Sequence, residues 1–180
     1  MQKQGKILII DDNEDILFAL NLLLKPHVEK VKVATQPERV AHFMETFEPD
    51  VILLDMNFTQ DADSGQEGFL WLKKIKEIDP DAVVIFITAY SDTEKAVQAI
   101  KAGATDFIPK PWAKDKLLAT VASAVQLRRS RTEVSRLKKQ VAALQSHQSF
   151  PEIIGESSPM LALFETIDKL KDTDANILIL

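Results

Sequence analysis

The chain of 180 residues contains no cysteine, which excludes disulfide bonds, thiol catalysis and thiolate metal sites. Its three histidines, His27, His42 and His147, are scattered and lack the spacing of metal ligands. No apolar run approaches the roughly 20 residues that a membrane-spanning helix needs, and the N-terminus shows no signal-peptide core. Acidic residues outnumber basic ones by only 27 to 22, so no overall charge attracts the chain to nucleic acid or anionic membranes. These absences favour a cytoplasmic, soluble protein.

The chain does contain a regular alternation of short apolar runs and amphipathic segments. Three of the runs have the Val, Ile and Leu content of a buried strand, the run at 31–34 alternates apolar and polar residues, and the run at 105–108 is short. Each run is followed by a segment with helical periodicity. Five such units predict an α/β fold, a doubly wound five-stranded parallel sheet with helices on both faces, for residues 5 to about 127. The predicted strands are residues 7–10, 31–34, 51–54, 83–87 and 105–108.

Local signals mark where the predicted helices begin and end. Asn13 is a predicted N-cap, Ser91-x-x-Glu94 has the pattern of a capping box, and Gly103 is a predicted C-terminal stop. The polar stretch from Met56 to Gly68 is long for a loop between a strand and a helix. We expect this loop to serve function or to be mobile.

Polar side chains follow several of the predicted strands. Asp11 and Asp12 come after the first, Asp55 ends the third, Thr88 ends the fourth, and Lys110 follows the fifth. Because the carboxyl ends of parallel strands meet at one edge of a sheet, these side chains should converge. Three ionised carboxylates would repel one another, and a divalent cation relieves that repulsion. Oxygen ligands without nearby His or Cys suit Mg²⁺.

The same residues suggest a reaction. The main-chain carbonyl of Asn57 offers a further oxygen to the cation, Lys110 balances negative charge, and Thr88 offers a hydroxyl to an anion. Asp55 is then equipped as a nucleophile toward phosphorus, which gives an aspartyl phosphate. The simpler interpretation of Asp11 and Asp12 is a helix cap and its neighbour.

With these residues in this order, the sequence resembles the receiver domain of two-component response regulators over nearly all of residues 5–127. The resemblance implies a flavodoxin-like receiver fold and a Mg²⁺ cofactor. It also assigns a role to each matching position: Asp11 and Asp12 as the acidic pair that binds the metal, Asp55 as the phosphoacceptor and metal ligand, Asn57 as the carbonyl donor, Thr88 as the switch hydroxyl, Lys110 as the conserved-type lysine before a usually cis Pro111, and Phe107 as the switch aromatic.

The resemblance further implies that Asp55 accepts a phosphoryl group from the phosphohistidine of a sensor kinase. Thr88 would then move toward the phosphate and Phe107 would turn inward. Such a protein is a stoichiometric phosphoacceptor with slow autodephosphorylation rather than an enzyme. Two features depart from the family pattern: the long loop after Asp55, and Phe107, which lacks the hydroxyl of the tyrosine often found there. The alternative for Phe107 is core packing alone.

The last helix of the α/β region has no predicted stop. From Leu117 to about Gln148 there is no glycine or proline, and apolar residues recur at the a/d spacing of a coiled coil. We expect a homodimer through residues 117–148, and the alternative is a solvated amphipathic connector. The cluster Arg128-Arg129-Ser130-Arg131 is interpreted as solvation of this helix, because no nucleic-acid-reading module accompanies it. The a/d residues are Leu127, Val134, Leu137, Val141 and Leu144.

Residues 153–160 and 174–180 are similar to the opening of the AAA+ ATPase domain of sigma-54-dependent, NtrC-like transcriptional activators. The resemblance implies a receiver domain at 1–127, a coiled-coil linker at 128–150 and the start of an AAA+ domain at 151–180. The Gly-rich phosphate loop would follow residue 180, so we expect the chain itself not to hydrolyse ATP. The implied parent protein binds DNA and sigma-54 RNA polymerase.

Two other functions stay open from the sequence. One is an aspartyl-phosphate phosphatase of another α/β family, which needs a second acid near its nucleophile, often two residues on, where this chain has Asn57. The other is a constitutive dimerisation or interaction module without phosphotransfer. Both use the same fold, so the site must distinguish them.

Overall fold

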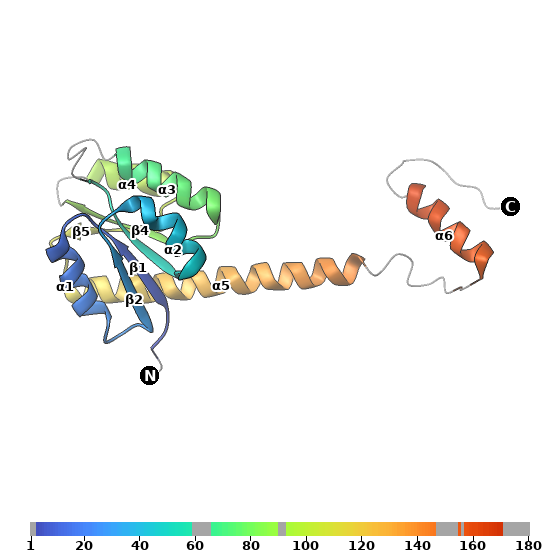
Figure 1. The fold of residues 1–180 in the computed structure, drawn as a ribbon, viewed down its shortest axis with the longest axis horizontal. Helices are drawn as coiled ribbons and strands as arrows, with labels where there is room; N and C mark the ends of the chain where they lie inside the picture. Colours follow the sequence, from blue (N-terminus) through green and yellow to red (C-terminus); the bar gives the residue numbers. More distant parts are fainter. Residues whose placement is uncertain (1–2, 59–65, 90–92, 147–154, 156, 171–180) are drawn as a thin grey trace. The chain divides into compact units, whose positions relative to one another are not determined.

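The computed structural model describes residues 3–58, 66–89, 93–146, 155 and 157–170. Five parallel strands form one sheet in the order β2-β1-β3-β4-β5 (Figure 1), as the alternating pattern predicted. The central position of β3 follows from its composition, since all five of its residues are buried. The strands are β1 (Lys6–Ile10), β2 (Lys30–Ala34), β3 (Val51–Asp55), β4 (Val84–Ala89) and β5 (Asp106–Lys110).

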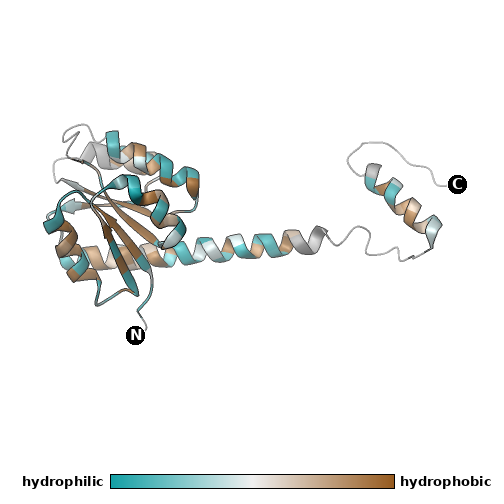
Figure 2. Cartoon of the chain, in the orientation of Figure 1, coloured by the Kyte–Doolittle hydropathy of each residue, from teal (hydrophilic) through white to brown (hydrophobic). Residues whose placement is uncertain are grey.

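Helices cover both faces of the sheet. On one face, α1 and α5 pack their buried leucines and valines against alternate strand residues such as Ile9 and Leu53. On the other face, α2, α3 and α4 pack against the intervening residues such as Leu8 and Phe86. The strands are correspondingly the most hydrophobic part of the fold (Figure 2). The helices are α1 (Glu14–Leu24), the short 3-10 helix η1 (Pro37–Arg39), α2 (Val40–Thr46), α3 (Gln66–Ile78), α4 (Thr93–Lys101), α5 (Lys114–Ser146) and α6 (Ser158–Leu170).

Two of the predicted helix signals are confirmed. The Asn13 side chain accepts hydrogen bonds from the main-chain N–H groups of Asp15 and Ile16, which caps α1. Gly103 has φ +105° and ends α4: its N–H donates to the Ile100 carbonyl, and the next N–H donates to the Ala99 carbonyl. This pair of bonds satisfies the last carbonyls of the helix and needs a left-handed residue. The predicted capping box includes Ser91, which lies outside the described residues.

Helix α3 begins at Gln66, two residues before the predicted end of the long loop at Gly68. Gly68, interpreted as a loop glycine, lies in the first turn of α3. A Cβ at this position would lie 2.7 Å from the main-chain oxygen of Met56 and 3.0 Å from its Cα. The glycine therefore allows α3 to approach the end of β3 closely. Residues 59–65 of the loop lie outside the described residues.

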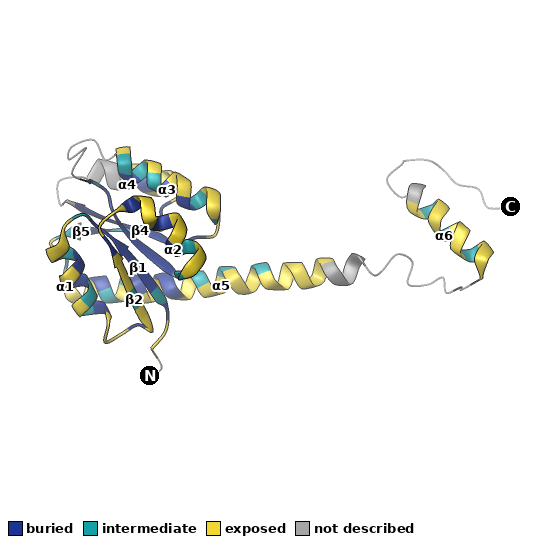
Figure 3. Ribbon diagram, in the orientation of Figure 1, coloured by how far each residue is buried: buried dark blue, intermediate teal, exposed yellow. Residues whose placement is uncertain are grey.

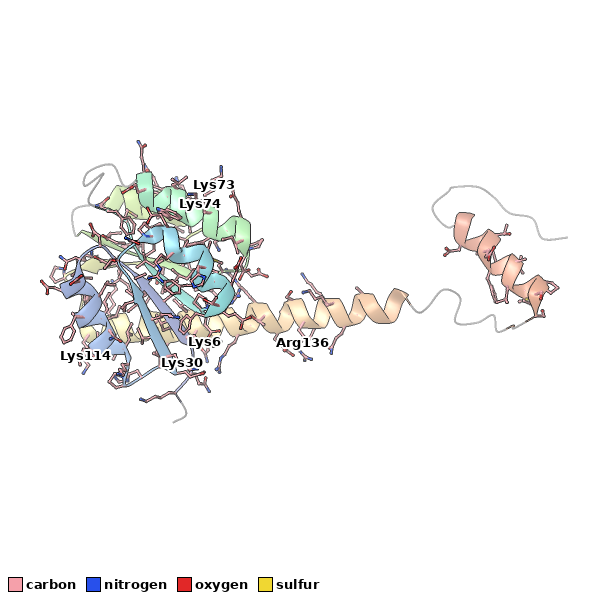
Figure 4. The ribbon with its side chains drawn as sticks, in the orientation of Figure 1. Lys6, Lys30, Lys73, Lys74, Lys114 and Arg136 are labelled. Atoms are coloured by element: carbon pink, nitrogen blue, oxygen red, sulfur yellow. The ribbon has the colours of Figure 1, made fainter. Side chains whose placement is uncertain are left out.

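Strand β2 forms one border of the sheet. Its side chains are more exposed than those of the other strands: Lys30, labelled in Figure 4, and Lys32 are both exposed. Its neighbour in the sheet is β1, with Lys6 paired to Lys30 in register. A border strand with lysines contrasts with the wholly apolar central strand β3.

Helix α5 is 33 residues long and continues past the sheet-covering segment. The chain divides into two compact units, Met1–Glu133 and Val134–Leu180. Within α5, burial ends at Val125, and Val134, Leu137 and Val141 are exposed (Figure 3). The predicted strand at 176–180 lies outside the described residues, and the predicted division into three domains stays a prediction. Among the described residues, no helix has both the length and the apolar character needed to cross a membrane.

Candidate functional site

The carboxyl ends of β1 and β3 bring three carboxylates together. Asp55 is the last residue of β3, and Asp11 and Asp12 directly follow β1, which pairs with β3 in parallel. One oxygen from each of the three lies within 4.8 Å of the others. Asp11 is fully buried, Asp55 is 6% exposed and Asp12 is half-buried. This separation suits a shared divalent cation, because each carboxylate offers a hard oxygen ligand.

Lys110, the last residue of β5, reaches into this cluster. Its amine donates hydrogen bonds to Oδ2 of Asp11 at 2.8 Å and to Oδ1 of Asp55 at 3.0 Å. The Oδ1 atom of Asp55 also accepts a hydrogen bond from the main-chain N–H of Met56. Two buried carboxylates therefore share one ammonium group, which neutralises part of their charge. The peptide bond from Lys110 to Pro111 is cis, as the resemblance implied.

The electrostatics favour a reactive carboxyl at Asp55. Burial and the neighbouring Asp11 carboxylate raise the pKa of Asp55 from 3.8 to about 6, against the opposing effect of Lys110. Burial alone would lower the pKa of Lys110, but the hydrogen bond to Asp11 and the charge of Asp55 outweigh it, so the pKa lies above its ordinary value. An ionised Asp55 beside a protonated Lys110 is therefore a partly desolvated nucleophile.

The structure places the other predicted residues around this edge of the sheet. Thr88 is buried near the end of β4, one residue beyond Ile87, which pairs with Asp55 in the sheet register. Phe107 is a half-buried residue of β5 that packs against the core on the α2, α3 and α4 face. Asn57 is half-buried two residues after Asp55, and its side-chain oxygen is buried without a hydrogen-bond partner in the part of the chain that the structure describes.

Glu67 is a neighbour of the site that the sequence reasoning did not single out. It lies in the first turn of α3, and it lines a cavity of about 370 Å³ together with Asp12, Phe58 and residues of the β2–α2 connection. One of its carboxylate oxygens is buried and has no hydrogen-bond partner among the described residues. An acid in the first turn of a helix is a common feature, so its sequence position gave no signal of this environment.

The donor set fits a small, hard cation. The oxygens come from three carboxylates, and no histidine or cysteine belongs to this cluster of described residues. Mg²⁺ binds through one or two carboxylates plus waters and phosphoryl oxygens. The residues present could therefore hold such an ion, and its charge would oppose the effects of burial and of Asp11 that raise the pKa of Asp55.

Comparison with protein families identifies the family of the fold. The model of the response regulator receiver domain matches residues 7–122. The chain belongs to this family. The receiver includes β1 to β5 and the first part of α5, so the clustered aspartates and Lys110 all lie within the matched region.

Relatives extend the likeness beyond the receiver. The C4-dicarboxylate transport transcriptional regulatory protein DctD of Pseudomonas aeruginosa is 33% identical over 98% of this chain and 37% of its own length. The DNA-binding transcriptional regulator NtrC of Proteus hauseri is 30% identical over 99% of this chain and 35% of its own length. The chain thus spans little more than a third of the length of these curated relatives.

Solved structures give the same result. The N-terminal signal receiver domain of a two-component response regulator from Bacteroides fragilis is 42% identical, with a TM-score of 0.62 over 68% of this chain and 98% of that one. NtrX from Brucella abortus, solved with ADP, is 27% identical, with a TM-score of 0.68 over 94% of this chain and 36% of its own. The first likeness covers the receiver, and the second continues through the segment that follows it.

Proposed function

We propose that this receiver accepts a phosphoryl group on Asp55 from the phosphohistidine of a sensor histidine kinase. The observation that carries the proposal is the contact of the Lys110 amine with both Asp11 and Asp55, in a cluster where three carboxylates lie within 4.8 Å. An ammonium group such as that of Lys110 compensates negative charge on a phosphoryl group during its transfer. Family membership supports the same reaction.

In this reaction an oxygen of the Asp55 carboxylate attacks phosphorus, and the phosphorus–nitrogen bond to the kinase imidazole breaks. The imidazole leaves with the bonding electron pair and takes up a proton. Lys110 then contacts the phosphoryl oxygens in place of one of its two carboxylate contacts. Asp11, Asp12, Asp55 and the main-chain carbonyl of Asn57 would hold Mg²⁺, which supplies further charge neutralisation to the transferring group.

The response of the fold would begin at Thr88 and Phe107. Thr88 is buried near the end of β4, beside the strand that carries Asp55, so its hydroxyl needs only a local movement to reach a phosphoryl group on Asp55. Phe107 lies in the adjacent strand β5 and is only half-buried, so an inward turn would bury more of its ring. A phosphate that contacts Thr88 in one arrangement and not in the other shifts the population between them.

The direct test is phosphorylation with acetyl phosphate and Mg²⁺, followed by intact-mass spectrometry. The wild-type chain should gain one phosphoryl group, and Asp55→Asn should gain none. The matched control is Asp106→Asn, because Asp106 is a half-buried aspartate at the start of β5, away from the cluster, and it should gain the label like the wild type. Labelling of Asp55→Asn at the wild-type level would refute the assignment. Multiple turnover of a small phosphoester, which is not a phosphoryl donor to a receiver, would instead indicate a phosphatase.

For the whole protein, we propose a sigma-54-dependent transcriptional activator that acts in the cytoplasm and binds DNA outside this segment. The relatives DctD and NtrC support this role, since both are named as transcriptional regulators. Phosphorylation would change the association of two copies through residues 117–148. The exposed apolar residues Val134, Leu137 and Val141 at a/d spacing support that contact, because isolated amphipathic helices bury such a stripe by pairing.

A further inference from the structure

The turn between α3 and β4, residues 79–82, accepts contacts from two helices. From α3, the amine of Lys76 donates to the carbonyl of Ala82 at 2.6 Å and to that of Pro80 at 3.4 Å. From α5, two arginines reach the same turn. This turn lies at the opposite end of β4 from Thr88, so these contacts are separate from the phosphoacceptor site.

The two α5 contacts are of different kinds. Arg128 forms an ion pair with Asp79, with Nη2 and Oδ2 at 2.6 Å, and both side chains are mostly buried at 21% and 29% exposed. Arg131 donates from Nη1 to the main-chain carbonyl of Asp81 at 3.2 Å. Arg129, between them, points elsewhere and bonds to the Gln4 side chain. The cluster Arg128-Arg129-Ser130-Arg131 was predicted only to solvate the helix. Two of its arginines instead bind one turn of the receiver.

These polar contacts hold α5 where apolar packing has ended. The buried side chains of α5 end at Val125, and Leu127 is already exposed. Beside the ion pair, a cavity of about 420 Å³ separates Arg128 and Thr132 from apolar residues that include Met44 and Ile78. A cavity lies beside this part of α5 where a packed apolar interface would otherwise hold the helix. We therefore expect the attachment of α5 to the receiver at this point to depend on the two arginines.

The turn itself is rigid enough to serve as an anchor. The Oδ1 atom of Asp79 accepts a hydrogen bond from the N–H of Asp81, and the Asp79 carbonyl accepts one from the N–H of Ala82. Burial and the nearby Arg131 lower the pKa of Lys76, while the acids of the turn oppose that effect. Three cationic side chains thus meet at a turn with two aspartates, so the charges of Asp79 and Asp81 offset a local excess of positive charge.

We propose that Arg128 and Arg131 form a clamp on the α3–β4 turn that makes the first turns of the linker helix, up to about residue 132, part of the receiver. With the clamp closed, a displacement of α5 in the receiver is carried into the following helix as a rigid movement. With the clamp open, the helix frays or bends at residues 126–132, and the displacement is lost there. The first claim, that the clamp attaches the start of the linker helix to the receiver, concerns the unphosphorylated chain. The second claim, that the clamp carries a displacement into the following helix, rests on the proposed function.

The test of the clamp is hydrogen–deuterium exchange of the 180-residue chain without phosphate or Mg²⁺. Arg128→Gln/Arg131→Gln should exchange the amides of residues 127–134 about three- to tenfold faster than the wild type. The control is Arg129→Gln, which removes one of the neighbouring positive charges of the helix, where the double variant removes two, and whose hydrogen bond is with Gln4 rather than with residues 79–82; it should exchange like the wild type. Equal exchange in the double variant and in Arg129→Gln would overturn the clamp.

Two further measurements keep this result interpretable. Unchanged protection of β3 amides shows that each variant is folded, and repetition at a tenfold lower protein concentration removes any protection from self-association. A charge swap, Asp79→Arg with Arg128→Asp, should restore at least half of the protection that Arg128→Asp alone loses. Failure of the swap, with β3 still protected, would also count against the clamp.

The second claim is tested with beryllofluoride and Mg²⁺. In the wild type, the analogue should change exchange both around β3 and in residues 134–142. In Arg128→Gln/Arg131→Gln, the change around β3 should remain, and the change in residues 134–142 should fall by at least half. A response of 134–142 equal to the wild type would overturn this claim, whereas no response around β3 in the wild type would refute the proposed function instead.

Discussion

The ammonium group of Lys110 lies 3.0 Å from the Asp55 carboxylate, although 55 residues separate the two in the chain. The contact forms because β3, β4 and β5 are parallel and lie side by side in the sheet, so their carboxyl ends meet at the same edge. The same amine contacts Asp11, so one cation serves the ends of two neighbouring strands. Loss of this cation should therefore affect both folding and phosphorylation.

Replacement of Lys110 by glutamine should lower the free energy of unfolding by about 1–3 kcal/mol near neutral pH without Mg²⁺. The reason is that Asp11 and Asp55 lose their shared cation, and the value is modest because the Lys110 side chain is 26% exposed. Urea denaturation measures the loss, and added Mg²⁺ should recover part of it. The control Lys138→Gln, on an exposed turn of α5, should change stability by less than about 0.5 kcal/mol. Equal stability of the two variants would contradict the role of Lys110.

The raised pKa of Asp55 predicts an unusual dependence of stability on pH in Mg²⁺-free solution. Because the folded-state pKa of about 6 exceeds the ordinary 3.8, the folded protein binds this proton more tightly than the unfolded chain. The resulting stabilisation is present below about pH 4 and is lost as the pH rises through about 6. Asp55→Asn has no such loss, so it should exceed the wild type by about 1–3 kcal/mol near pH 7 and by much less near pH 4.5.

Urea titrations of both proteins with EDTA at each pH measure this difference. Mg²⁺ should reduce it near pH 7, because the ion favours the ionised carboxyl. A difference that stays constant from about pH 4.5 to 7 would show that Asp55 does not titrate in this range.

Gly68→Ala should destabilise the receiver although alanine favours helices. The new Cβ would meet the main chain of Met56 at 2.7 Å, and main-chain atoms cannot move aside as a flexible side chain can. The overpacking should cost about 1–3 kcal/mol in chemical denaturation, after a gain of at most ~1 kcal/mol from helix propensity. Gly155→Ala, outside the receiver, is the control, because the atoms nearest to its new Cβ belong to the Met160 side chain rather than to the main chain. A stabilised Gly68→Ala protein would show that α3 does not need this close approach.

Leu137→Lys should weaken self-association through the linker helix. The leucine lies on the exposed a/d stripe, where a lysine would place charge in the contact of two helices. We expect the dissociation constant of the dimer to rise about thirtyfold, which corresponds to roughly 2 kcal/mol. Ala142→Lys adds the same charge off the stripe and should associate like the wild type. Sedimentation that finds wild-type monomers at all concentrations would contradict the predicted homodimer.

The sequence predicted those parts of the fold that depend on local chemistry. The Asn13 cap, the Gly103 stop and the apolar strands each result from contacts within a few residues, so their patterns are visible in one dimension. The convergence of Asp11, Asp55 and Lys110 was also predictable, because parallel topology forces their strand ends together.

The features that sequence reasoning missed depend on contacts between distant segments. Gly68 was interpreted as part of a loop because it ends a polar, turn-rich stretch, whereas it allows α3 to approach Met56 closely. Arg128 and Arg131 were interpreted as solvated because basic residues on an exposed helix usually are, and their partners lie about 50 residues away in the chain. No local pattern identifies an ion pair between two such segments.

The lysines of β2 have a consequence for how copies of this protein meet. A sheet border with free main-chain groups invites a neighbouring chain to add another strand, which is the first step of many aggregates. Here any chain that aligns with β2 meets a strand that carries two exposed lysines, Lys30 and Lys32. Growth of the sheet from one molecule to the next is disfavoured at this border, and recognition between molecules is left to helices.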